Sequence, residues 1–474
     1  MIFTSIEFLL FFLLVLLTLR ALRHDSADKW FLLVASYVFY MSWNVACGGL
    51  ILFTSMTDYI VGRRLVRVED AGRRKLLLAV SLVLNLGVLA FFKYTNFLYD
   101  NLRLLLDPLG VHVHKTHFDI ILPAGVSFFT FQSMSYTIDV YRRKLEPSRN
   151  LRNFLLFVAF FPQLLAGPIV RAAVLLPQLA RRLRASALDI ETGLSYFLLG
   201  AVKKTVISDQ ISGHIDLIFS APGNYDALTL LQGVLGYAIQ IYCDFSGYSD
   251  MAIGCARMMG YHFPENFQMP YSALNMTEFW RRWHISLSTW LRDYLYISLG
   301  GNRLGLLRTY SNLMVTMLLG GLWHGASWNF VLWGALHGLA LAAHRFWREH
   351  EFLSAWLKRP AVNVVWRLIS HCLTLGVVLL GWVFFRAASL ATAGQYLTRL
   401  LSWSSEGTRL VSPFILPALA GVVLVHLIFP KDYNWSEDIP RHSAPVRILA
   451  YASLLILVVC LGATDAAPFI YFQF

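Results

Sequence analysis

The chain has 474 residues, of which 57% are hydrophobic and only 14% are charged, and its mean hydropathy is +0.55. A soluble chain carries about a quarter charged residues, so this composition excludes an ordinary soluble domain and predicts a polytopic membrane protein. The formal net charge of +12 is concentrated in short loops between apolar runs, which indicates membrane topology and does not indicate nucleic-acid binding.

Apolar runs separated by basic loops predict the membrane crossings. Outside the central region these runs are 2–19, 30–46, 50–61, 76–92, 120–141, 190–219, 229–247, 364–385, 413–430 and 448–463. The loops 63–75 and 142–152 are strongly basic, which places them in the cytoplasm and the N-terminus in the periplasm. The predicted fold class is an all-α integral membrane protein, a single domain over 1–474 with about 11 or 12 transmembrane helices.

The run 153–170 differs from the others because basic residues flank it on both sides and Pro162, Gly167 and Pro168 interrupt it. Proline and glycine weaken a continuous helix, and two cytoplasmic flanks exclude a single crossing. We therefore expect a re-entrant or interfacial hairpin here.

The polar residues in the remaining runs and loops are better explained by pairing with other groups of the protein than by a catalytic or metal-binding role. Lys203 and Lys204 are expected to snorkel or to face a wet interior, and Asp244 is expected to pair with a basic or backbone group. Three histidines lie in the loop 93–119, namely His112, His114 and His117. A solvated turn explains them better than a metal site, because no carboxylate or cysteine lies beside them. The five cysteines are scattered without paired spacing and support neither disulfides nor zinc.

The segment 277–303, TEFWRRWHISLSTWLRDYLYISLGGNR, has the strongest pattern in the chain. On one helix its tryptophans, leucines and His284 share one face, and its arginines share the other. We predict an amphipathic helix at the membrane interface with His284 in the middle of the apolar face. A core histidine bonded to a carbonyl is the alternative, but ionisable groups inside membrane proteins tend to mark sites.

The apolar runs 309–322 and 328–344 have basic outer flanks, so they predict a hairpin with its apex at Trp323–Ser327, WHGAS. This arrangement places His324 far from the basic side, inside or across the bilayer. Glycines around the apex allow the backbone to turn or pack closely there. A histidine is a suitable general base because its unperturbed pKa is about 6.5.

Together these segments resemble the membrane-bound O-acyltransferase (MBOAT) family, and within it the bacterial alginate O-acetyltransferase-like branch. The matching motifs are Tyr37–Tyr40, Phe128–Arg142, Phe161–Pro168, Tyr242–Asp250, Phe279–Arg303, Trp323–Gly325 and Phe469–Phe474. The resemblance implies that His324, in Trp-His-Gly, is catalytic and that His284 is the branch's second characteristic histidine. It also implies a ring of helices around a thin, funnelled centre, with the core motifs at 240–345.

The function that this resemblance implies is O-acyl transfer in the bacterial inner membrane, from a cytoplasmic thioester such as acetyl-CoA to an exopolysaccharide or cell-wall glycan. His324 would deprotonate the acceptor hydroxyl, and His284 would orient the thioester. The expected substrate-binding residues are Trp280, Trp283, Trp323, Asn302 and Arg303. The expected partners are a periplasmic esterase-like protein and membrane lipids; no bound metal or redox cofactor is expected, because the thioester supplies the driving force.

Two other classes of function remain open. A transporter could move an acyl donor or a lipid-linked sugar without chemistry, with the histidines as a proton relay. The lack of an internal repeat and the scarcity of intramembrane carboxylates argue against it. A non-catalytic scaffold for polymer secretion would leave His284 and His324 unexplained. If the chain is an enzyme, we predict that these histidines lie on opposite approaches to one passage and do not form a hydrogen-bonded pair.

Overall fold

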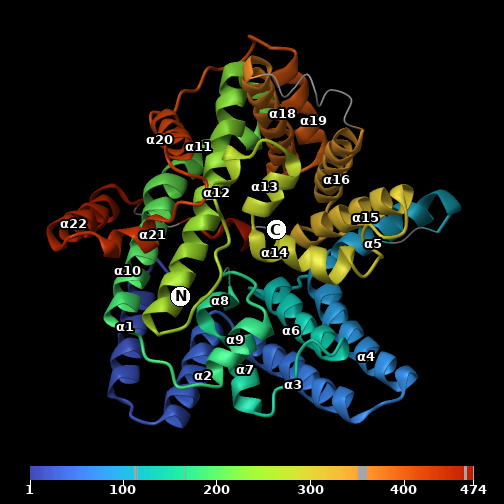
Figure 1. Ribbon diagram of the computed structural model, residues 1–474. Coiled ribbons are helices and arrows are strands. Elements are labelled where there is room, and N and C mark those ends of the chain that lie inside the picture. Colours follow the sequence, from blue (N-terminus) through green and yellow to red (C-terminus); the bar gives the residue numbers. More distant parts are fainter. Residues whose placement is uncertain (112–113, 115, 166, 351–359, 464–466, 473–474) are drawn as a thin grey trace. The chain divides into compact units, whose positions relative to one another are not determined.

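The computed structural model describes residues 1–111, 114, 116–165, 167–350, 360–463 and 467–472, which form helices joined mostly by short loops (Figure 1). Within this part of the chain the β-type pairing is an isolated bridge between Tyr225 and Thr408. The predicted all-α class is therefore confirmed. The chain divides into two compact units, Met1–Phe197 with Asp250–Pro264, and Leu198–Ser249 with Glu265–Phe474.

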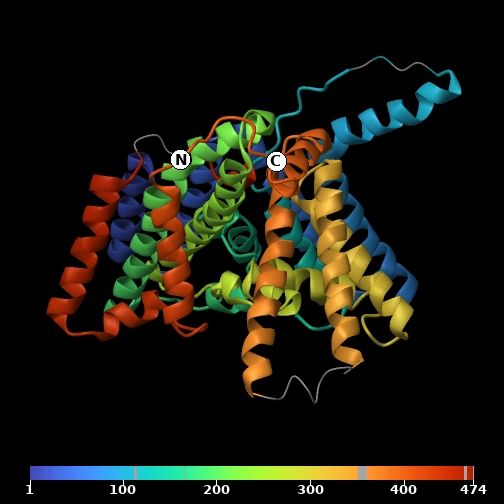
Figure 2. The same ribbon diagram turned by 90° about the horizontal axis from the view of Figure 1, so that it is seen from above.

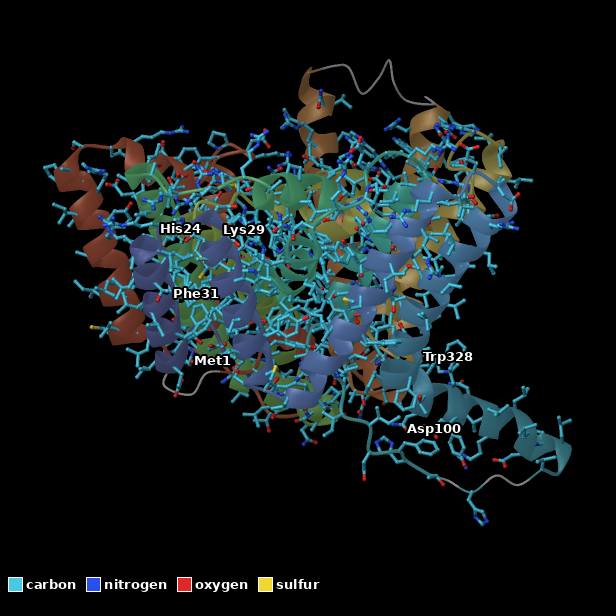
Figure 3. All side chains as sticks on the ribbon, turned by 90° about the horizontal axis from the view of Figure 1, so that it is seen from below. Met1, His24, Lys29, Phe31, Asp100 and Trp328 are labelled. Carbon is cyan, nitrogen blue, oxygen red and sulfur yellow. The ribbon has the colours of Figure 1, made fainter. Side chains whose placement is uncertain are left out.

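The first unit is built from the N-terminal helices. They are α1 (Ile6–Ala21), α2 (Asp25–Met41), α3 (Val45–Arg67), α4 (Ala71–Leu89), the π-helix η1 (Ala90–Tyr94), α5 (Thr95–Leu106), the 3-10 turn η2 (Asp107–Leu109), α6 (Val126–Tyr141), α7 (Leu151–Ala159), α8 (Phe161–Leu164), α9 (Ala172–Leu179) and most of α10 (Ala187–Ala201). Ser5 and Asp70 cap α1 and α4 by accepting hydrogen bonds from Phe8 N and Arg73 N. In Figure 3, Met1 and His24 lie at opposite ends of α1.

Two of the predictions from the sequence concern this unit, namely a loop from residue 93 and an interruption of the run 153–170. The segment expected to be a loop from residue 93 instead continues from α4 through η1 and α5 to Leu106, and α5 projects from the rest of the unit (Figures 2 and 3). The run 153–170 is interrupted as predicted, because Phe160 separates α7 from α8. Its placement in a membrane stays a prediction. His112 lies outside the described residues.

The second unit contains the remaining elements. They are the π-helix η3 (Val202–Ser208), α11 (Asp209–Ser220), η4 (Pro222–Asn224), α12 (Ala227–Met258), η5 (Pro270–Ser272), α13 (Met276–Arg282), α14 (Ile285–Trp290), the π-helix η6 (Leu291–Tyr296), α15 (Leu306–His324), α16 (Trp328–Glu349), α18 (Pro360–Arg386), α19 (Leu390–Leu401), α20 (Ile415–Ile428), α21 (Trp435–Asp438), η7 (Ile439–Arg441), α22 (Ala444–Leu461) and η8 (Ile470–Phe472). The last turns of α12 belong to the first unit.

The predicted hairpin at 309–344 is confirmed as α15 and α16, joined at the apex around Gly325. Its two helices pack closely because glycines lie at their contact. A Cβ atom at Gly321 would overlap the carbonyl of Phe330, and one at Gly334 would overlap the carbonyl of Met317. Small residues at such contacts are typical of helix packing in membranes.

Four helical stretches of the described chain are long and apolar enough, by length and composition, to cross a membrane: Val45–Arg67, Ala71–Leu109, Val362–Arg386 and Ala444–Leu461. The last of these, α22, has no buried residue and exposes Leu449, Ile456 and Val459. Such an apolar surface is suited to lipid. The other expected crossings are shorter or more polar helices and stay predictions.

Candidate active site

His284 lies at a break, which corrects the prediction of one continuous amphipathic helix through Trp280–Tyr294. Helix α13 ends at Arg282, α14 begins at Ile285, and the φ angle of His284 between them is +41°. This left-handed conformation is unfavourable for a residue with a side chain. Periodicity did not reveal the break because neither glycine nor proline marks it.

Asn266 holds the backbone at this break. Its main-chain oxygen accepts a hydrogen bond from Ile285 N at 2.9 Å. Its Oδ1 accepts hydrogen bonds from Ser286 N at 3.2 Å and Ser286 Oγ at 2.8 Å, and lies 3.2 Å from His284 Nδ1. The Asn266 amide in turn donates to Ser249 Oγ at 3.1 Å. An acceptor beside Nδ1 favours the tautomer of His284 that carries its proton there.

The imidazoles of His284 and His324 belong to one buried aromatic cluster. The Trp323 ring lies 6.1 Å from that of His284 and 5.0 Å from that of His324, between ring centroids. His324 also contacts Trp333 at 4.9 Å and Phe385 at 5.1 Å. The exposed fractions of the two histidines are 0% and 3%. Two groups that the sequence singled out separately are therefore brought to the same indole.

Of the residues expected to bind substrate, the three tryptophans are buried and the other two are exposed. Trp280 and Trp283 lie on or directly after α13, and Trp283 contacts Trp382 at 5.0 Å between ring centroids. Asn302 and Arg303 lie in the exposed turn between η6 and α15. Their role in binding stays a prediction.

Sequence reasoning missed two residues of this cluster. His337 on α16 is fully buried and contacts Trp333 at 4.6 Å and Trp280 at 5.3 Å. Neither of its ring nitrogens has a hydrogen-bond partner among the described residues. An ionisable residue inside the apolar run 328–344 was the available signal. Tyr471 contacts both His284 and His324, and only the closing motif pointed to it.

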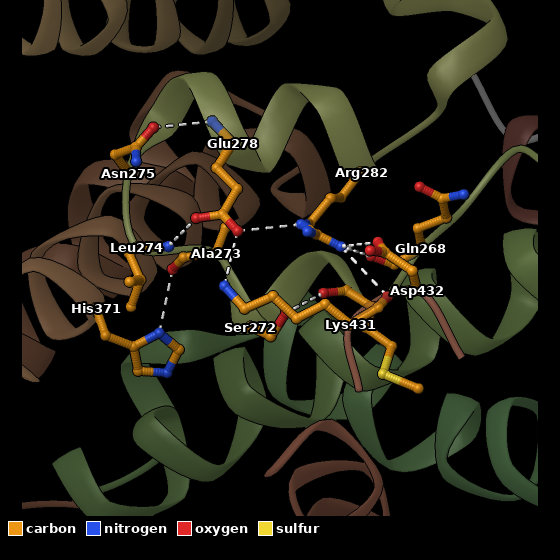
Figure 4. A network of polar contacts seen from close by, with 11 residues as sticks. Gln268, Ser272, Ala273, Leu274, Asn275, Glu278, Arg282, His371, Lys431 and Asp432 are labelled. Carbon is orange, nitrogen blue, oxygen red and sulfur yellow. Dashed lines mark hydrogen bonds and ion pairs between the residues drawn. The ribbon is translucent and has the colours of Figure 1, made fainter. Parts of the chain in front are cut away.

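A polar network around Glu278 holds α13, and with it two of the tryptophans (Figure 4). The Glu278 carboxylate accepts hydrogen bonds from Leu274 N at 2.9 Å, Lys431 Nζ at 2.7 Å and Arg282 Nε at 3.2 Å. Burial raises the pKa of the Glu278 carboxyl, but these hydrogen bonds and the two cationic charges outweigh it, so the pKa lies below its ordinary value. Because a carbonyl oxygen only accepts, Nδ1 of His371 on α18 donates to the Ala273 carbonyl at 3.1 Å.

A buried ion triad holds the C-terminal segment. Lys204 lies 2.8 Å from Asp209 and 2.6 Å from Asp244, which confirms the expected pairing of that carboxylate. The Lys204 ammonium also donates to the Ala467 carbonyl at 2.8 Å, and Ile470 N donates to Asp244 at 2.8 Å. These bonds position the segment that carries Tyr471.

The cluster offers imidazoles for proton transfer and indole N–H groups for binding an oxyanion, within an apolar surrounding. Among the described residues, no group of three or more histidine, cysteine, aspartate or glutamate side chains could hold a metal ion. The apolar helices and the buried histidines define an integral membrane protein with a candidate site for acid–base chemistry.

Comparison with known proteins identifies the family. The model of the MBOAT, membrane-bound O-acyltransferase family, matches residues 141–383, and the chain belongs to this family of acyltransferases. It is 39% identical, over the full length of both chains, to a Pseudomonas putida protein named "Probable alginate O-acetylase AlgI". A Pseudomonas aeruginosa protein of the same name is 44% identical over 85% of this chain and 76% of its own. The "Peptidoglycan O-acetyltransferase" of Helicobacter pylori is 36% identical over 78% of this chain and 73% of its own.

Proposed function

We propose that this chain is an acetyltransferase of the bacterial inner membrane that serves the O-acetylation of an exopolysaccharide or cell-wall glycan. The names of the relatives, alginate O-acetylase and peptidoglycan O-acetyltransferase, support acetyl as the group and a polysaccharide as its destination. The single observation that carries the proposal for the site is the contact of both His284 and His324 with the Trp323 indole inside a buried cluster.

In the proposed reaction His324 is the general base and the donor is a cytoplasmic thioester, with acetyl-CoA as the first candidate. The acceptor hydroxyl gives its proton to the His324 imidazole as its oxygen attacks the acyl carbon. A carbon–oxygen bond forms and the carbon–sulfur bond breaks. The departing thiolate takes the proton back from the imidazolium, so the products are an ester and a free thiol. The indole N–H groups of Trp283 and Trp323 are candidate donors to the oxyanion.

His284 is proposed to orient the donor. Its Nδ1 is placed beside Asn266 and Ser286, which fix the ring. A periplasmic esterase-like protein is the proposed partner that carries acetyl onward, and the N-terminus is proposed to lie in the periplasm. The alternative, transport of an acyl donor or lipid-linked sugar without chemistry, predicts no covalent transfer at all.

The test is acyl transfer by the purified chain with a labelled acetyl thioester. His324→Ala should lower the rate by about 10²- to 10⁴-fold, the usual contribution of one general base, with folded protein recovered at the normal level. His284→Ala should raise the KM for the thioester more than that for the acceptor. His214→Ala is the matched control, because this half-buried histidine lies on α11 outside the cluster. Half of the wild-type activity in His324→Ala would contradict the assignment, and the absence of transfer by the wild type would favour the transporter.

A further inference from the structure

A basic cavity lies within the first unit, apart from the residues assigned to catalysis. The end of α3, the start of α4 and the loop after α6 line an open cavity of about 700 Å³. This size is in the range of sites for small molecules. Six basic side chains line it, namely Arg63, Arg67, Arg74, Arg143, Lys144 and Arg149, against two acidic ones, Glu69 and Glu146.

The positive charge of this cavity is only partly compensated by Glu69 and Glu146, since basic side chains outnumber acidic ones in its lining. Among the described residues, five of the six basic side chains form neither a hydrogen bond nor an ion pair; Arg74 is the exception. Like charges gathered around a concavity repel one another and create a positive potential. A bound anion would relieve that repulsion.

Arg74 is a buried residue of the cavity lining. Its buried guanidinium donates to the carbonyls of Leu65, Val68 and Tyr141, at 3.4 Å for Val68 and 2.7 Å for Tyr141. It therefore ties the end of α3 to the end of α6. The walls of the cavity are fixed by this cation before any ligand arrives, which lowers the entropic cost of binding.

The loop after α6 is also held in place. The Tyr59 hydroxyl donates to the Arg149 carbonyl at 3.1 Å, and the Tyr136 hydroxyl accepts from Ser148 N at 3.1 Å. Tyr136 packs closely against Gly62, where a Cβ would lie 2.7 Å from the Tyr136 hydroxyl oxygen. The basic side chains thus extend from a rigid frame.

The backbone conformation of Arg143 also supports a ligand site here. It follows the end of α6 with a φ angle of +59°, and its N–H donates to the Val140 carbonyl at 3.1 Å. Glycine usually occupies this left-handed position after a helix, because a side chain is strained there. Keeping an arginine in it places a guanidinium at the cavity, and such outliers are frequent at ligand sites.

We propose that this cavity binds the phosphate groups of an anionic ligand. Guanidinium groups match phosphate oxygens in charge and in two-point geometry. The phosphates could come from a nucleotide-linked thioester such as coenzyme A or from the headgroup of a membrane lipid; the first source rests on the proposed function, and the phosphate site itself does not. Membrane topology alone requires basic loops but no rigid cavity.

The test uses the full chain in nanodiscs of neutral phosphatidylcholine with tritiated coenzyme A as the probe and inorganic pyrophosphate as the competitor. Arg143→Gln/Lys144→Gln should weaken binding about 100-fold, because each lost charge-assisted bond corresponds to about tenfold. Arg20→Gln/Arg23→Gln is the matched control: it removes the same charge from exposed positions in the last turn of α1 and the loop after it, and it should leave binding unchanged. Arg149→Gln replaces the double variant if that variant does not fold, with a loss of about tenfold expected.

A second arm distinguishes the source of the phosphate. Retention of phosphatidylglycerol by the purified chain is measured by native mass spectrometry in the same variants. Retention that depends on Arg143 and Lys144, without coenzyme A binding, assigns the cavity to lipid phosphate. If neither probe depends on these residues, or if the control loses as much, the basic residues serve topology only and the proposal is wrong. Binding in His324→Ala should equal that of the wild type, so the outcome is independent of the catalytic assignment.

Discussion

The backbone of His284 illustrates how much one residue can depend on its neighbours. A left-handed conformation costs about 1–3 kcal/mol for a residue with a side chain. Asn266 and Ser286 offset this cost with the hydrogen bonds that join them across the break. The result is an imidazole that faces Trp323 and Phe245 instead of following the face of a regular helix.

Glu278 gives a prediction at the same scale. Its folded pKa lies below the ordinary value of 4.5, so its contribution to stability is complete above that pH and is lost as the pH falls through the lowered pKa. Glu278→Gln should cost about 1 kcal/mol at pH 7, since the carboxylate is partly exposed and screened. Thermal unfolding in detergent between pH 7 and pH 3 should show the difference from wild type shrinking in acid. Glu406→Gln, at an exposed position, should show no such convergence.

At the scale of elements, the Lys204 triad joins the π-helix η3 to the segment 467–472. Asp244→Asn keeps the shape of the side chain but removes its ion pair with Lys204, which keeps Asp209 as a partner. Because Lys204 is still paired with Asp209, the loss should be smaller than the about 3–5 kcal/mol of a buried pair that leaves a charge without a partner. We expect lower thermal stability and faster maleimide labelling of a cysteine placed at Pro468.

Asp216→Asn is the control for this element, because Asp216 pairs with Arg386 at the surface and such pairs contribute about 0–1 kcal/mol. Both variants are compared in a background without the exposed native cysteines. Equal labelling at position 468 in Asp244→Asn and wild type would show that the triad does not hold the C-terminal segment.

At the scale of the whole molecule the orientation in the membrane is the main prediction. Single cysteines at Glu69 and Glu146 should react with an impermeant maleimide only from the cytoplasmic side, because both belong to strongly basic loops. A cysteine at Leu105, on the projecting α5, should react from the periplasm. Labelling of position 146 in intact cells would contradict the assigned side of both the basic cavity and the α15–α16 hairpin.

The sequence by itself determined most of the helical segments and where the hairpin with His324 turns, but not α5 or the break at His284. A helix in lipid satisfies its backbone hydrogen bonds within its own segment. The positions of such helices can therefore be predicted from apolar runs and the basic loops between them. Local patterns also marked Asp244 as a paired group and Pro162 as part of an interruption, and the structure confirms both.

The tertiary structure alone decided which of these groups meet. The break at His284 depends on Asn266, the cluster includes His337 and Tyr471, and the basic cavity forms only where α3, α4 and the loop after α6 converge. These contacts join residues that are distant in the chain. Periodicity shows which residues share one face of a helix, but it does not show which other element packs against that face. Only the packing of the folded chain decides that contact.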